Sequence, residues 1–586
     1  MKFSDFCGYL EKIEATTLRN EIMEILADLF KKASEDEIQQ IVYLSLGRLR
    51  PKFDRLEFNL AEKMVVRSIA RAFNLPADEV MGVYKEVGDM GDVVKKLMSD
   101  LKNSEKGKVS HSVHEVYGSL EKIAKDEGQG SQERKIFMFA DLMASTNALE
   151  AGYISKIVLG KLRLGFSDKT ILDALSFMEH KSKEGRKDLD HAYQVSPDVG
   201  NIAKLVKKYG ISGVMDRVKI SFGVPVVPAL AQRLKTADEM VEKMGEVMLE
   251  AKYDGTRVQI HWRRESKEEK KSDGLFELEN SKDSEVRTFT RNLDENSHMF
   301  PELLDISSQM KVDEVILDAE AIGYDPKTGD LLPFQMTITR KRKHGISKAQ
   351  ESVPLKFFVF DVLYVDGKSV IKMPLRERRK LLEEVVGEGE VLVIDDFLVT
   401  DNPSKIRNFH KGKLDQGLEG AMVKKIDGPY SPGRTGWNWV KFKEVEEANG
   451  KLSDTIDVVV MGYNKGRGKR AAFGIGAFLA GVTMGKSLAT VAKVGTGLSD
   501  EQWREMKRRV GECEVEKKPK EYGEVDKTLI PDVWVEPKIV VEVAADEITK
   551  SPSHSAKKAL RFPRLVKFRD DKSVEEITKV EELDSI

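Results

Sequence analysis

The sequence predicts a multidomain protein with an all-α region first, an α+β domain next and a small β-barrel last. Several domains are expected because 586 residues exceed what one hydrophobic core usually organises. About the first 215 residues repeat apolar side chains at helical spacing, as in LRNEIMEILADLFKKA and AEKMVVRSIARAFNL. Later segments alternate apolar and polar residues between glycine-containing turns, which is typical of strands.

Two changes of pattern give the expected domain boundaries. The stretch SFGVPVVPALAQ breaks the helical pattern with two prolines and a glycine, so we expect the helical domain to cover residues 1–220. Short β-type runs then alternate with helical stretches such as RERRKLLEEVV, which predicts an α+β domain over residues 221–445. The remaining β-type runs, among them IDVVVMGYN and LATVAKVGTG, predict a β-barrel over residues 446–586.

Composition excludes several classes of protein. The two cysteines, Cys7 and Cys513, are far apart and can build neither a disulfide framework nor a four-cysteine zinc site, which indicates a reducing, intracellular setting. No apolar run approaches the ~20 residues that span a bilayer, so we expect a soluble, cytoplasmic protein without a membrane partner. The net charge of -2 leaves any preference for a charged partner to local clusters.

The stretch LEAKYDGTR, Leu249 to Arg257, places a lysine between two carboxylates and directly before a DG turn. Strand alternation predicts that Glu250, Lys252 and Asp254 share one face. The following TRVQIHWR alternates again, so the two segments are interpreted as neighbouring strands. A solvated ion-pair ladder at a strand end is the structural alternative.

Other β-type segments of the middle domain also carry charged or aromatic groups where buried strands are usually apolar. Each group alone could be a surface residue or a satisfied ion pair, but their recurrence indicates a site. These groups are Asp318 and Glu320 in LDAEAIGYD, Phe360 and Asp361 in FFVFDVLYVDG, Glu419 and Lys424 in LEGAMVKK, and Lys441 and Lys443 in NWVKFK.

The ordered motifs resemble a known family. KYDGTR is similar to the nucleophile motif of the covalent nucleotidyltransferases, and DAE, FVFD, EGAMVKK and WVKFK resemble the following motifs of that superfamily in the same order. LRFPRLVKFRDDKS and DVVVMGYNKGRGKR resemble the carboxyl-terminal motif and the barrel of ATP-dependent DNA ligases. IVLGKLRLGFSDKTILDAL resembles a signature of the DNA-binding domain of archaeal and eukaryotic replicative ligases.

This resemblance implies a fold and an activity. The three domains would be a helical DNA-binding domain, an adenylation (nucleotidyltransferase) domain and an OB-fold domain. The activity would be ATP-dependent sealing of nicks in duplex DNA, joining a 3′-hydroxyl to a 5′-phosphate through a lysyl-AMP intermediate, in replication, recombination and repair. The implied cofactors are ATP and Mg²⁺, with Mn²⁺ as an alternative metal.

The resemblance also implies roles for individual residues. Lys252 would be the nucleophile, Phe360 would stack on adenine, and Glu250 would lie near the base. Glu320 and Glu419 would hold the metal. The residues expected to bind the nucleotide are Glu250, Lys252, Arg257, Arg291, Glu320, Phe360, Arg434, Lys441, Lys443, Arg561 and Arg564.

The chemistry of the nucleophile sets a condition of its own. A lysine must be neutral when it attacks phosphorus, although its ordinary pKa is about 10.4. Glu250 and Asp254 favour the charged amine, whereas neighbouring cations favour the neutral one. We therefore expect Lys441, Lys443 and a divalent metal to dominate around the nucleophile.

Three local features depart from the family pattern or compete with it. The charged segment RRESKEEKKSDGLFELENSKDSEVR is longer than the family usually has and is interpreted as a loop extension. Arg287 competes with Arg291 as the arginine that the resemblance implies to hold ribose and phosphate, and the TRN context favours Arg291. GVTMGKS resembles a P-loop but has three residues between its glycines where the motif requires four, so it is interpreted as a hairpin turn.

Three basic, glycine-containing clusters suit phosphate contacts without base readout: TRKRKHGISK, NKGRGKR and GKLRLG. Solvated charged loops are the alternative interpretation. We expect nicked double-stranded DNA as the partner, a monomeric, nucleoid-associated protein and, by family analogy alone, a sliding clamp. The residues expected to contact DNA are Lys161, Arg163, Lys465, Arg467, Lys469 and Arg470.

Four other functions are less consistent with the sequence. An mRNA capping enzyme or an RNA ligase shares the nucleophilic lysine, but the helical amino-terminal region and the RFPR segment argue against both. An inactive DNA-binding scaffold would not need the intact motifs. An NAD-dependent ligase is disfavoured because its four-cysteine zinc module cannot be built from two cysteines.

Overall fold

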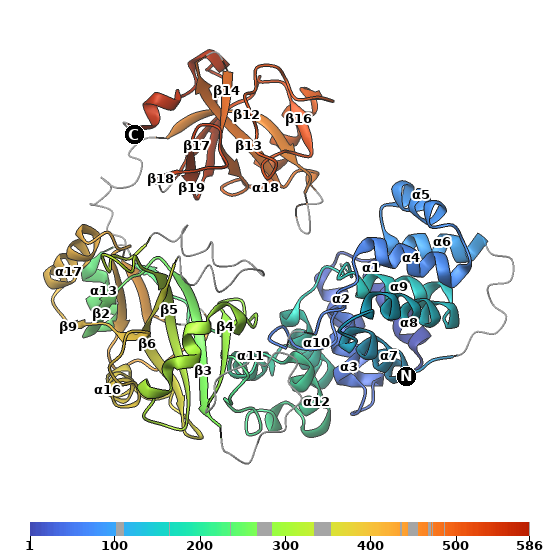
Figure 1. Ribbon diagram of the computed structural model, residues 1–586, viewed down its shortest axis with the longest axis horizontal. Coiled ribbons are helices and arrows are strands. Elements are labelled where there is room, and N and C mark those ends of the chain that lie inside the picture. Colours follow the sequence, from blue (N-terminus) through green and yellow to red (C-terminus); the bar gives the residue numbers. More distant parts are fainter. Residues whose placement is uncertain are drawn as a thin grey trace. The chain divides into compact units, whose positions relative to one another are not determined.

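The computed structural model describes residues 1–54, 56–100, 110–162, 164–234, 236–265, 284–332, 353–433, 436–442, 455–466, 470, 473–485, 487–545 and 547–584. The chain divides into two compact units, Met1–Phe442 and Lys443–Ile586. The predicted fold class is confirmed: a helical region is followed by an α+β domain and then by a β-rich OB domain (Figure 1).

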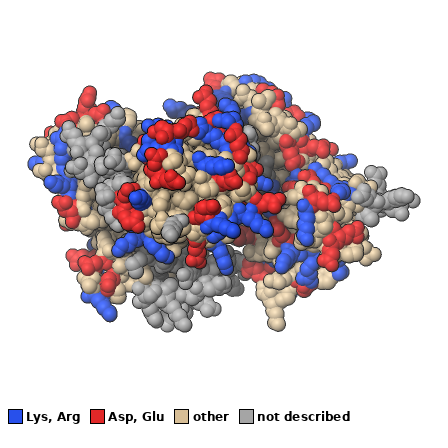
Figure 2. Space-filling model, turned by 90° about the horizontal axis from the view of Figure 1, so that it is seen from above, with Lys and Arg blue, Asp and Glu red and all other residues tan. Residues whose placement is uncertain are grey.

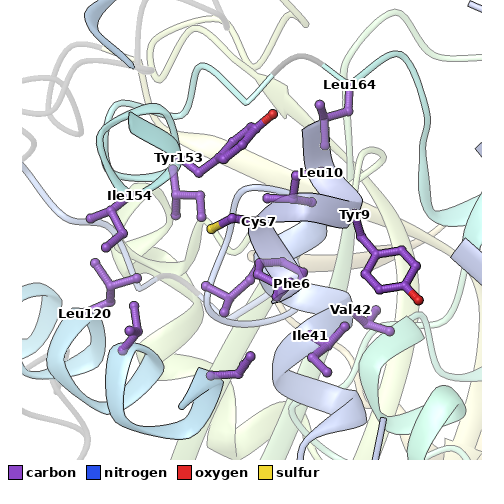
Figure 3. Close-up of a cluster of buried hydrophobic side chains, with 14 of the residues drawn as sticks. Phe6, Cys7, Tyr9, Leu10, Ile41, Val42, Leu120, Tyr153, Ile154 and Leu164 are labelled. Carbon is purple, nitrogen blue, oxygen red and sulfur yellow. The ribbon is translucent and has the colours of Figure 1, made fainter. Parts of the chain in front are cut away.

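The amino-terminal region is helical, as its periodicity predicts. Buried side chains from most of these helices form one core, and the helices α1, α3, α7 and α9 contribute most of the residues labelled in Figure 3, such as Phe6, Cys7 and Tyr153. The helices are α1 (Phe3–Glu14), α2 (Arg19–Lys32), α3 (Ile38–Ser45), α4 (Glu62–Phe73), α5 (Ala77–Val87), α6 (Met90–Asp100), α7 (Val113–Lys125), α8 (Ser131–Ser145), α9 (Ala148–Val158), α10 (Asp168–His180), α11 (Arg186–Val195) and α12 (Val199–Tyr209), followed by the 3₁₀ helix η1 (Ile211–Gly213).

Local sequence signals fix several helix ends. Ser112 accepts a hydrogen bond from the backbone of Glu115, whose side chain in turn accepts from the Ser112 backbone, so a capping box starts α7. Asn147 and Glu150 do the same for α9. Asn74, directly after the last residue of α4, adopts the left-handed conformation that commonly terminates a helix.

The α+β domain contains two separate sheets. Sheet 1 has the order β1-β11-β10-β2-β9, and sheet 2 has the order β4-β3-β5-β6-β7, with β8 beside β6. The strands of sheet 1 are β1 (Gln232–Leu234), β2 (Val247–Ala251), β9 (Phe397–Thr400), β10 (Ala421–Lys425) and β11 (Trp439–Phe442). The strands of sheet 2 are β3 (Thr256–Arg264), β4 (Ser284–Thr290), β5 (Glu314–Gly323), β6 (Leu355–Val365), β7 (Lys368–Ser369) and β8 (Leu392–Ile394).

Helices cover one face of each sheet. Leu249 and Val423 of sheet 1 pack in one cluster with residues of α13 (Ala237–Met244) and α17 (Pro403–Asp415). Sheet 2 packs Val258, Ile260 and Trp262 in a cluster with α16 (Leu375–Val385) and the 3₁₀ helix η3 (Pro301–Gln309), which follows the shorter η2 (Ser297–Met299). The predicted alternation of β3 is therefore confirmed, and its polar residues lie on the opposite face.

Residues 223–230, here called the strap, lie across that polar face of sheet 2. Gln259 and Val226 exchange two hydrogen bonds, with Val226 N–H donating to Oε1 at 2.8 Å and Nε2 donating to the Val226 carbonyl at 3.1 Å. Gly223 N–H donates to Nδ1 of His261 at 3.1 Å. Burial, reinforced by Arg287, lowers the pKa of His261 to about 3, so this ring is neutral and can accept the hydrogen bond.

The carboxyl-terminal unit is built around one curled sheet with the order β14-β13-β12-β16-β15, to which β17 and β20 are added along β12. Strand β12 pairs with β17 along its first half and with β16 along its second, and its pairing with β13 shifts register between Val460 and Gly462. Leu565 N–H donates to the Thr496 carbonyl, which brings β20 to the end of β14. The elements are β12 (Ile456–Asn464), β13 (Ala477–Met484), β14 (Ser487–Val494), α18 (Asp500–Gly511), β15 (Glu514–Val515), β16 (Val533–Val535), β17 (Val540–Ala544), β18 (Glu547–Lys550), β19 (Lys558–Arg561), β20 (Arg564–Phe568), η7 (Val574–Glu576) and η8 (Val580–Asp584).

The stretch GVTMGKS is a hairpin turn, as predicted. Met484 at the end of β13 pairs with Ser487 at the start of β14, and Gly485 between them has a φ of 61°. The P-loop interpretation is excluded because that motif needs a strand followed by a helix.

Candidate nucleotide-binding site

The motif KYDG crosses from sheet 1 to sheet 2. Strand β2 ends at Ala251 and β3 begins at Thr256, so Lys252 stands just beyond the last residue of β2. The expectation that β2 and β3 are neighbouring strands is wrong, because they belong to different sheets. Lys252 and Asp254 are not strand residues, so the predicted strand alternation over Glu250, Lys252 and Asp254 does not extend beyond β2.

Lys252 is held from both its backbone and its side chain. Its N–H donates to the Gly420 carbonyl at 2.9 Å, and its carbonyl accepts from Glu419 N–H at 3.0 Å, which extends the pairing of β2 with β10. The Lys252 ammonium forms an ion pair with the Glu419 carboxylate. The lysine side chain is 19% exposed and the glutamate side chain 34%, so the pair can be reached from solvent.

Gly255 is required by the crossing itself. A Cβ at this position would lie 2.6 Å from the carbonyl oxygen of Ala321 and 2.9 Å from Cγ of Glu320. Both atoms belong to β5, so the chain passes against this strand with no room for a side chain. The glycine of the KYDG motif therefore lets the chain after Lys252 pass directly against β5, which carries Glu320.

Glu250 is buried on the face of sheet 1 opposite to its helices. Lys424, also buried, places Nζ 2.5 Å from Oε2 of Glu250 and donates to the Phe360 carbonyl at 3.2 Å. Lys441 shares this face, because Met422 of β10 lies in register with Glu250 on one side and with Lys441 on the other. Among the residues that the structure describes, Oε1 of Glu250 is a buried oxygen without a hydrogen-bond partner.

Arg257 is the centre of a buried polar cluster on the facing sheet. Its guanidinium donates to both carboxylate oxygens of Asp318, at 2.9 and 2.6 Å, and to the Ala229 carbonyl of the strap at 2.6 Å. The Tyr430 hydroxyl donates to the same Asp318 at 2.7 Å and accepts from Ala229 N–H at 3.0 Å. Arg257 thus holds the strap against sheet 2.

Glu320 is the second carboxylate beside Lys252. It lies in register with Arg257 of β3 and with Phe358 of β6. Burial raises the pKa of its carboxyl to about 7, against the opposing effects of Arg257 and Lys252 and with smaller upward contributions from Asp318 and Asp254. This carboxyl is therefore partly protonated near neutral pH.

Aromatic side chains line the space between the two sheets. Phe360 of β6 meets Trp439 of β11 edge to face, with ring centroids 5.8 Å apart. The Lys424 ammonium lies 4.7 Å from the Phe360 ring centre and 4.4 Å from that of Trp439. Tyr253 stacks on Phe358 at 4.2 Å. These rings form an apolar wall beside the charged groups.

The remaining predicted residues of the adenylation domain differ in how far the structure describes them. Arg291 is exposed and directly follows β4, where the β3–β4 register continues toward Arg257. Lys441 lies in β11, as described above. Arg434 and Lys443 lie outside the described residues, so their assignment stays a prediction.

The predicted contacts in the carboxyl-terminal unit lie on two segments. Lys465 follows β12, and its backbone N–H donates to Asp532 at 2.8 Å. Arg470 donates to the Gly476 carbonyl at 2.8 Å and lies over the Trp503 ring. Arg561 ends β19 and Arg564 begins β20. Arg467 and Lys469 lie outside the described residues.

In the helical region, Lys161 forms an ion pair with Glu62 and lies over the Tyr84 ring. Arg163 lies outside the described residues, and so do the residues of TRKRKHGISK. Figure 2 shows acidic and basic side chains intermingled on the face that it presents, in keeping with the small net charge. Any attraction for nucleic acid must therefore come from local clusters.

Sequence reasoning missed part of the site. Asp318 and Asp361 were recognised as unusual, but their arginine partners, Arg257 and Arg378, were not assigned to them. Tyr430 and Trp439 were not singled out at all. One signal was available for Arg378: it occupies a position in RERRKLLEEVV where helical spacing from Leu375 predicts an apolar residue.

Two structural features are absent from the part of the chain that the structure describes. Within it, no helix has the length and apolar character needed to cross a bilayer. Within the same residues, no group of three or more histidine, cysteine or acidic side chains is arranged to hold a metal ion.

Comparisons with known proteins agree with this architecture. The family described as ATP dependent DNA ligase domain matches residues 228–443, DNA ligase N terminus matches residues 2–176, and ATP dependent DNA ligase C terminal region matches residues 471–572. A probable DNA ligase from Dictyoglomus turgidum is 40% identical over all of this chain and 97% of its own length. A DNA ligase from Pyrobaculum calidifontis is 37% identical over all of this chain and 98% of its own.

A solved structure named Pmar-Lig_PreS3 supports the fold alone, with a TM-score of 0.52, 17% identity and coverage of 96% of this chain and 99% of that one. The chain belongs to the ATP-dependent DNA ligase family. Its activity is ATP-dependent DNA ligation, with ATP as cofactor and DNA as substrate. The predicted family and enzyme class are confirmed.

The raised pKa of Glu320 predicts a pH-dependent cost to stability. A carboxyl whose pKa is about 7 in the folded protein and about 4.5 in the unfolded chain keeps its proton longer when folded, so stability falls as pH rises through that window. Glu320→Gln should remove this loss and raise the free energy of unfolding above pH 7 by on the order of 1–3 kcal/mol. Chemical denaturation at pH 4, 6 and 8 measures it, and an equal difference at all three values would contradict the assignment.

Proposed function

We propose that Lys252 is the nucleophile that takes AMP from ATP. The observation that carries this proposal is the position of its ammonium, which is paired with Glu419 at the crossing between two sheets whose facing sides hold Glu250, Glu320 and Arg257. A lysine beside carboxylates, an arginine and an aromatic wall has what a nucleoside triphosphate needs: an attacking group, charged contacts and a ring-stacking surface.

The proposed reaction has three transfers. The neutral amine of Lys252 attacks the α-phosphorus of ATP, a phosphorus–nitrogen bond forms, and pyrophosphate leaves with the electrons of the broken bond. The 5′-phosphate at a nick then attacks the same phosphorus and the lysine nitrogen leaves. Finally the 3′-hydroxyl attacks the 5′-phosphorus, AMP leaves, and a phosphodiester bond closes the nick.

Glu419 has a defined task before the first transfer. Its carboxylate pairs with the Lys252 ammonium, so this contact must loosen before the amine can lose a proton and attack. The 34% exposure of the Glu419 side chain leaves it room to move toward the phosphates. Glu320 lies on the other side of the crossing, against Gly255.

The donors present fit a magnesium ion, with manganese as the alternative. Glu320 and Glu419 offer carboxylate oxygens, and the raised pKa of Glu320 shows that the burial of its charge is not fully offset by the described residues. Two protein ligands suffice for Mg²⁺ because phosphate and water oxygens usually complete its shell. A bound Mg²⁺ would neutralise part of the triphosphate charge.

The nucleoside would lie between the sheets. Phe360 is proposed to stack on adenine, because its ring lies on the apolar wall next to Trp439. Glu250 is proposed to lie near the base, supported by its buried Oε1, which has no hydrogen-bond partner among the described residues. Arg257, Arg291, Lys441 and the undescribed Arg434 and Lys443 are proposed to bind ribose and phosphates.

The finer biological proposals rest on the family. We propose nicked duplex DNA as the substrate in replication, repair and recombination, a monomeric enzyme, and the domain division 1–220, 221–445 and 446–586. Recruitment by a sliding clamp is proposed by analogy alone.

Lys252→Arg should abolish formation of the covalent enzyme–AMP, because the guanidinium is not a competent nucleophile at neutral pH. Incubation with labelled ATP followed by denaturing electrophoresis measures the adduct. Lys411→Arg, on the exposed surface of α17, is the matched control and should retain it. A Lys252→Arg protein that still gains one AMP by intact mass would overturn the assignment.

Glu419→Gln should slow adenylation by about 100-fold and raise the magnesium concentration needed for half-maximal rate, because one charged oxygen ligand is lost. The rate of adenylation is followed across a magnesium titration. Asp415→Asn removes an exposed carboxylate four residues earlier and serves as the control. An unchanged magnesium dependence in Glu419→Gln would remove this residue from the metal proposal.

Two predicted surfaces of the carboxyl-terminal unit should act in different steps. Arg561→Ala should slow adenylation by ATP more than it slows sealing of a nick that already carries AMP, because we propose, from the family resemblance, that Arg561 acts on the pyrophosphate. Lys465→Ala should instead weaken nick binding and reduce its salt dependence by about one released ion. Single-turnover assays of the two steps, with binding measured at several salt concentrations, separate them. Equal defects of Arg561→Ala in both steps would indicate a general structural role.

A further inference from the structure

Helix α16 carries two arginines in its buried stripe. Leu375, Leu382 and Val385 are buried at helical spacing, and Arg378 and Arg379 occupy the positions between them. Their side chains are 0% and 4% exposed. A buried guanidinium is costly unless it is paired and hydrogen-bonded, so each arginine must have a task that an apolar residue could not perform.

Arg378 fastens the helix to sheet 2. It donates to both carboxylate oxygens of Asp361, at 2.8 and 3.0 Å, and to the carbonyls of Met373 and Gly428. Asp361 directly follows Phe360 in β6. These hydrogen bonds satisfy the buried Arg378, so its role is structural.

Arg379 reaches the other sheet. Its Nη1 lies 3.6 Å from Oε1 of Glu250, and its guanidinium carbon lies 4.8 Å from the centre of the Phe397 ring. Phe397 of β9 is in register with Glu250 of β2, so Arg379 contacts two residues that lie side by side in sheet 1. At 3.6 Å the charge attracts the carboxylate but makes no hydrogen bond, which leaves the lone pairs of Oε1 available to another donor.

Arg379 also reaches the nucleophile segment through Asp395. Its Nη2 donates to the Asp395 carbonyl, and the Asp395 carboxylate accepts from the Tyr253 hydroxyl at 2.6 Å. Tyr253 is the residue after Lys252, and its ring stacks on Phe358. The tyrosine is therefore held both by stacking and by the segment that Arg379 binds.

We propose that Arg379 is a positioning residue for adenylation, which orients Glu250 directly and the Lys252 segment through Asp395 and Tyr253. This inference rests on the proposed function, since it assigns Lys252 and Glu250 to the same reaction. Arg379 touches neither ATP nor the reacting atoms in this account. Its effect must therefore pass through Glu250 and Tyr253.

A double-mutant cycle tests this coupling. Arg379→Gln should raise the KM for ATP in self-adenylation by about tenfold and lower the maximal rate several-fold. In a Glu250→Gln background the same substitution should change the KM by less than about twofold, because the group it orients is already altered. In a Tyr253→Phe background, Arg379→Gln should likewise lower the maximal rate much less than it does in the wild-type protein.

The matched control is Glu383→Gln. Glu383 also pairs with Arg379, at 3.2 Å, but its side chain is half exposed. It should leave KM and rate unchanged. If Arg379→Gln does not fold, Arg379→Lys keeps the charge near Glu250 while losing the fork that reaches Asp395, and should lower the maximal rate more than it raises the KM.

Two results would overturn the proposal: full additivity of Arg379→Gln with both Glu250→Gln and Tyr253→Phe, or an equal defect in Glu383→Gln. The proposed function is tested separately by peptide mapping of the Arg379→Gln protein at saturating ATP. AMP found on Lys252 would support the proposed function even if the coupling to Glu250 and Tyr253 is not observed. AMP found on another residue would remove the basis of both.

Discussion

The site depends on one short crossing between two sheets. Lys252 extends the pairing of β2 with β10 by two backbone hydrogen bonds, and three residues later Gly255 passes against β5 without space for a Cβ. The lysine is therefore fixed to sheet 1 while the chain beside it touches sheet 2. This constraint brings Glu419, which precedes β10 of sheet 1, and Glu320 of β5 in sheet 2 near the same lysine.

Burying charged side chains on the facing sides of the two sheets costs folding free energy. Glu250 with Lys424 and Arg257 with Asp318 are ion pairs in which both side chains are largely buried. Buried pairs often contribute less stability than apolar residues of the same volume, because both charges lose water. Their arrangement around Lys252 is better explained by a need to fix charge for a triphosphate in advance than by a need for stability. The raised pKa of Glu320 indicates that neighbouring groups do not fully offset the burial of its charge.

The order of the domains and much of the local structure could be predicted from the sequence. The alternation of TRVQIHWR correctly predicted a strand with one apolar face, whose Val258, Ile260 and Trp262 pack in a core, and the spacing of GVTMGKS correctly excluded a P-loop. Pairing between strands was not accessible in the same way. The DG turn after Lys252 predicted two neighbouring strands, but a turn signal is local. The partners of β2 lie 147 to 178 positions away, and those of β3 lie 20 to 65 positions away. The same limit hid the roles of Asp318 and Arg379, whose partners are distant in sequence.

The amine of Lys252 at this crossing is proposed to carry the nucleotide. Incubating the wild-type protein with ATP and magnesium, digesting it under conditions that preserve phosphoramide bonds, and mapping the modified peptide by mass spectrometry tests this claim most directly. We expect one AMP on the peptide that contains Lys252, and its loss on addition of pyrophosphate as ATP re-forms. AMP located on any other residue, or a fully modified protein in which the Lys252 peptide is unmodified, would contradict the account.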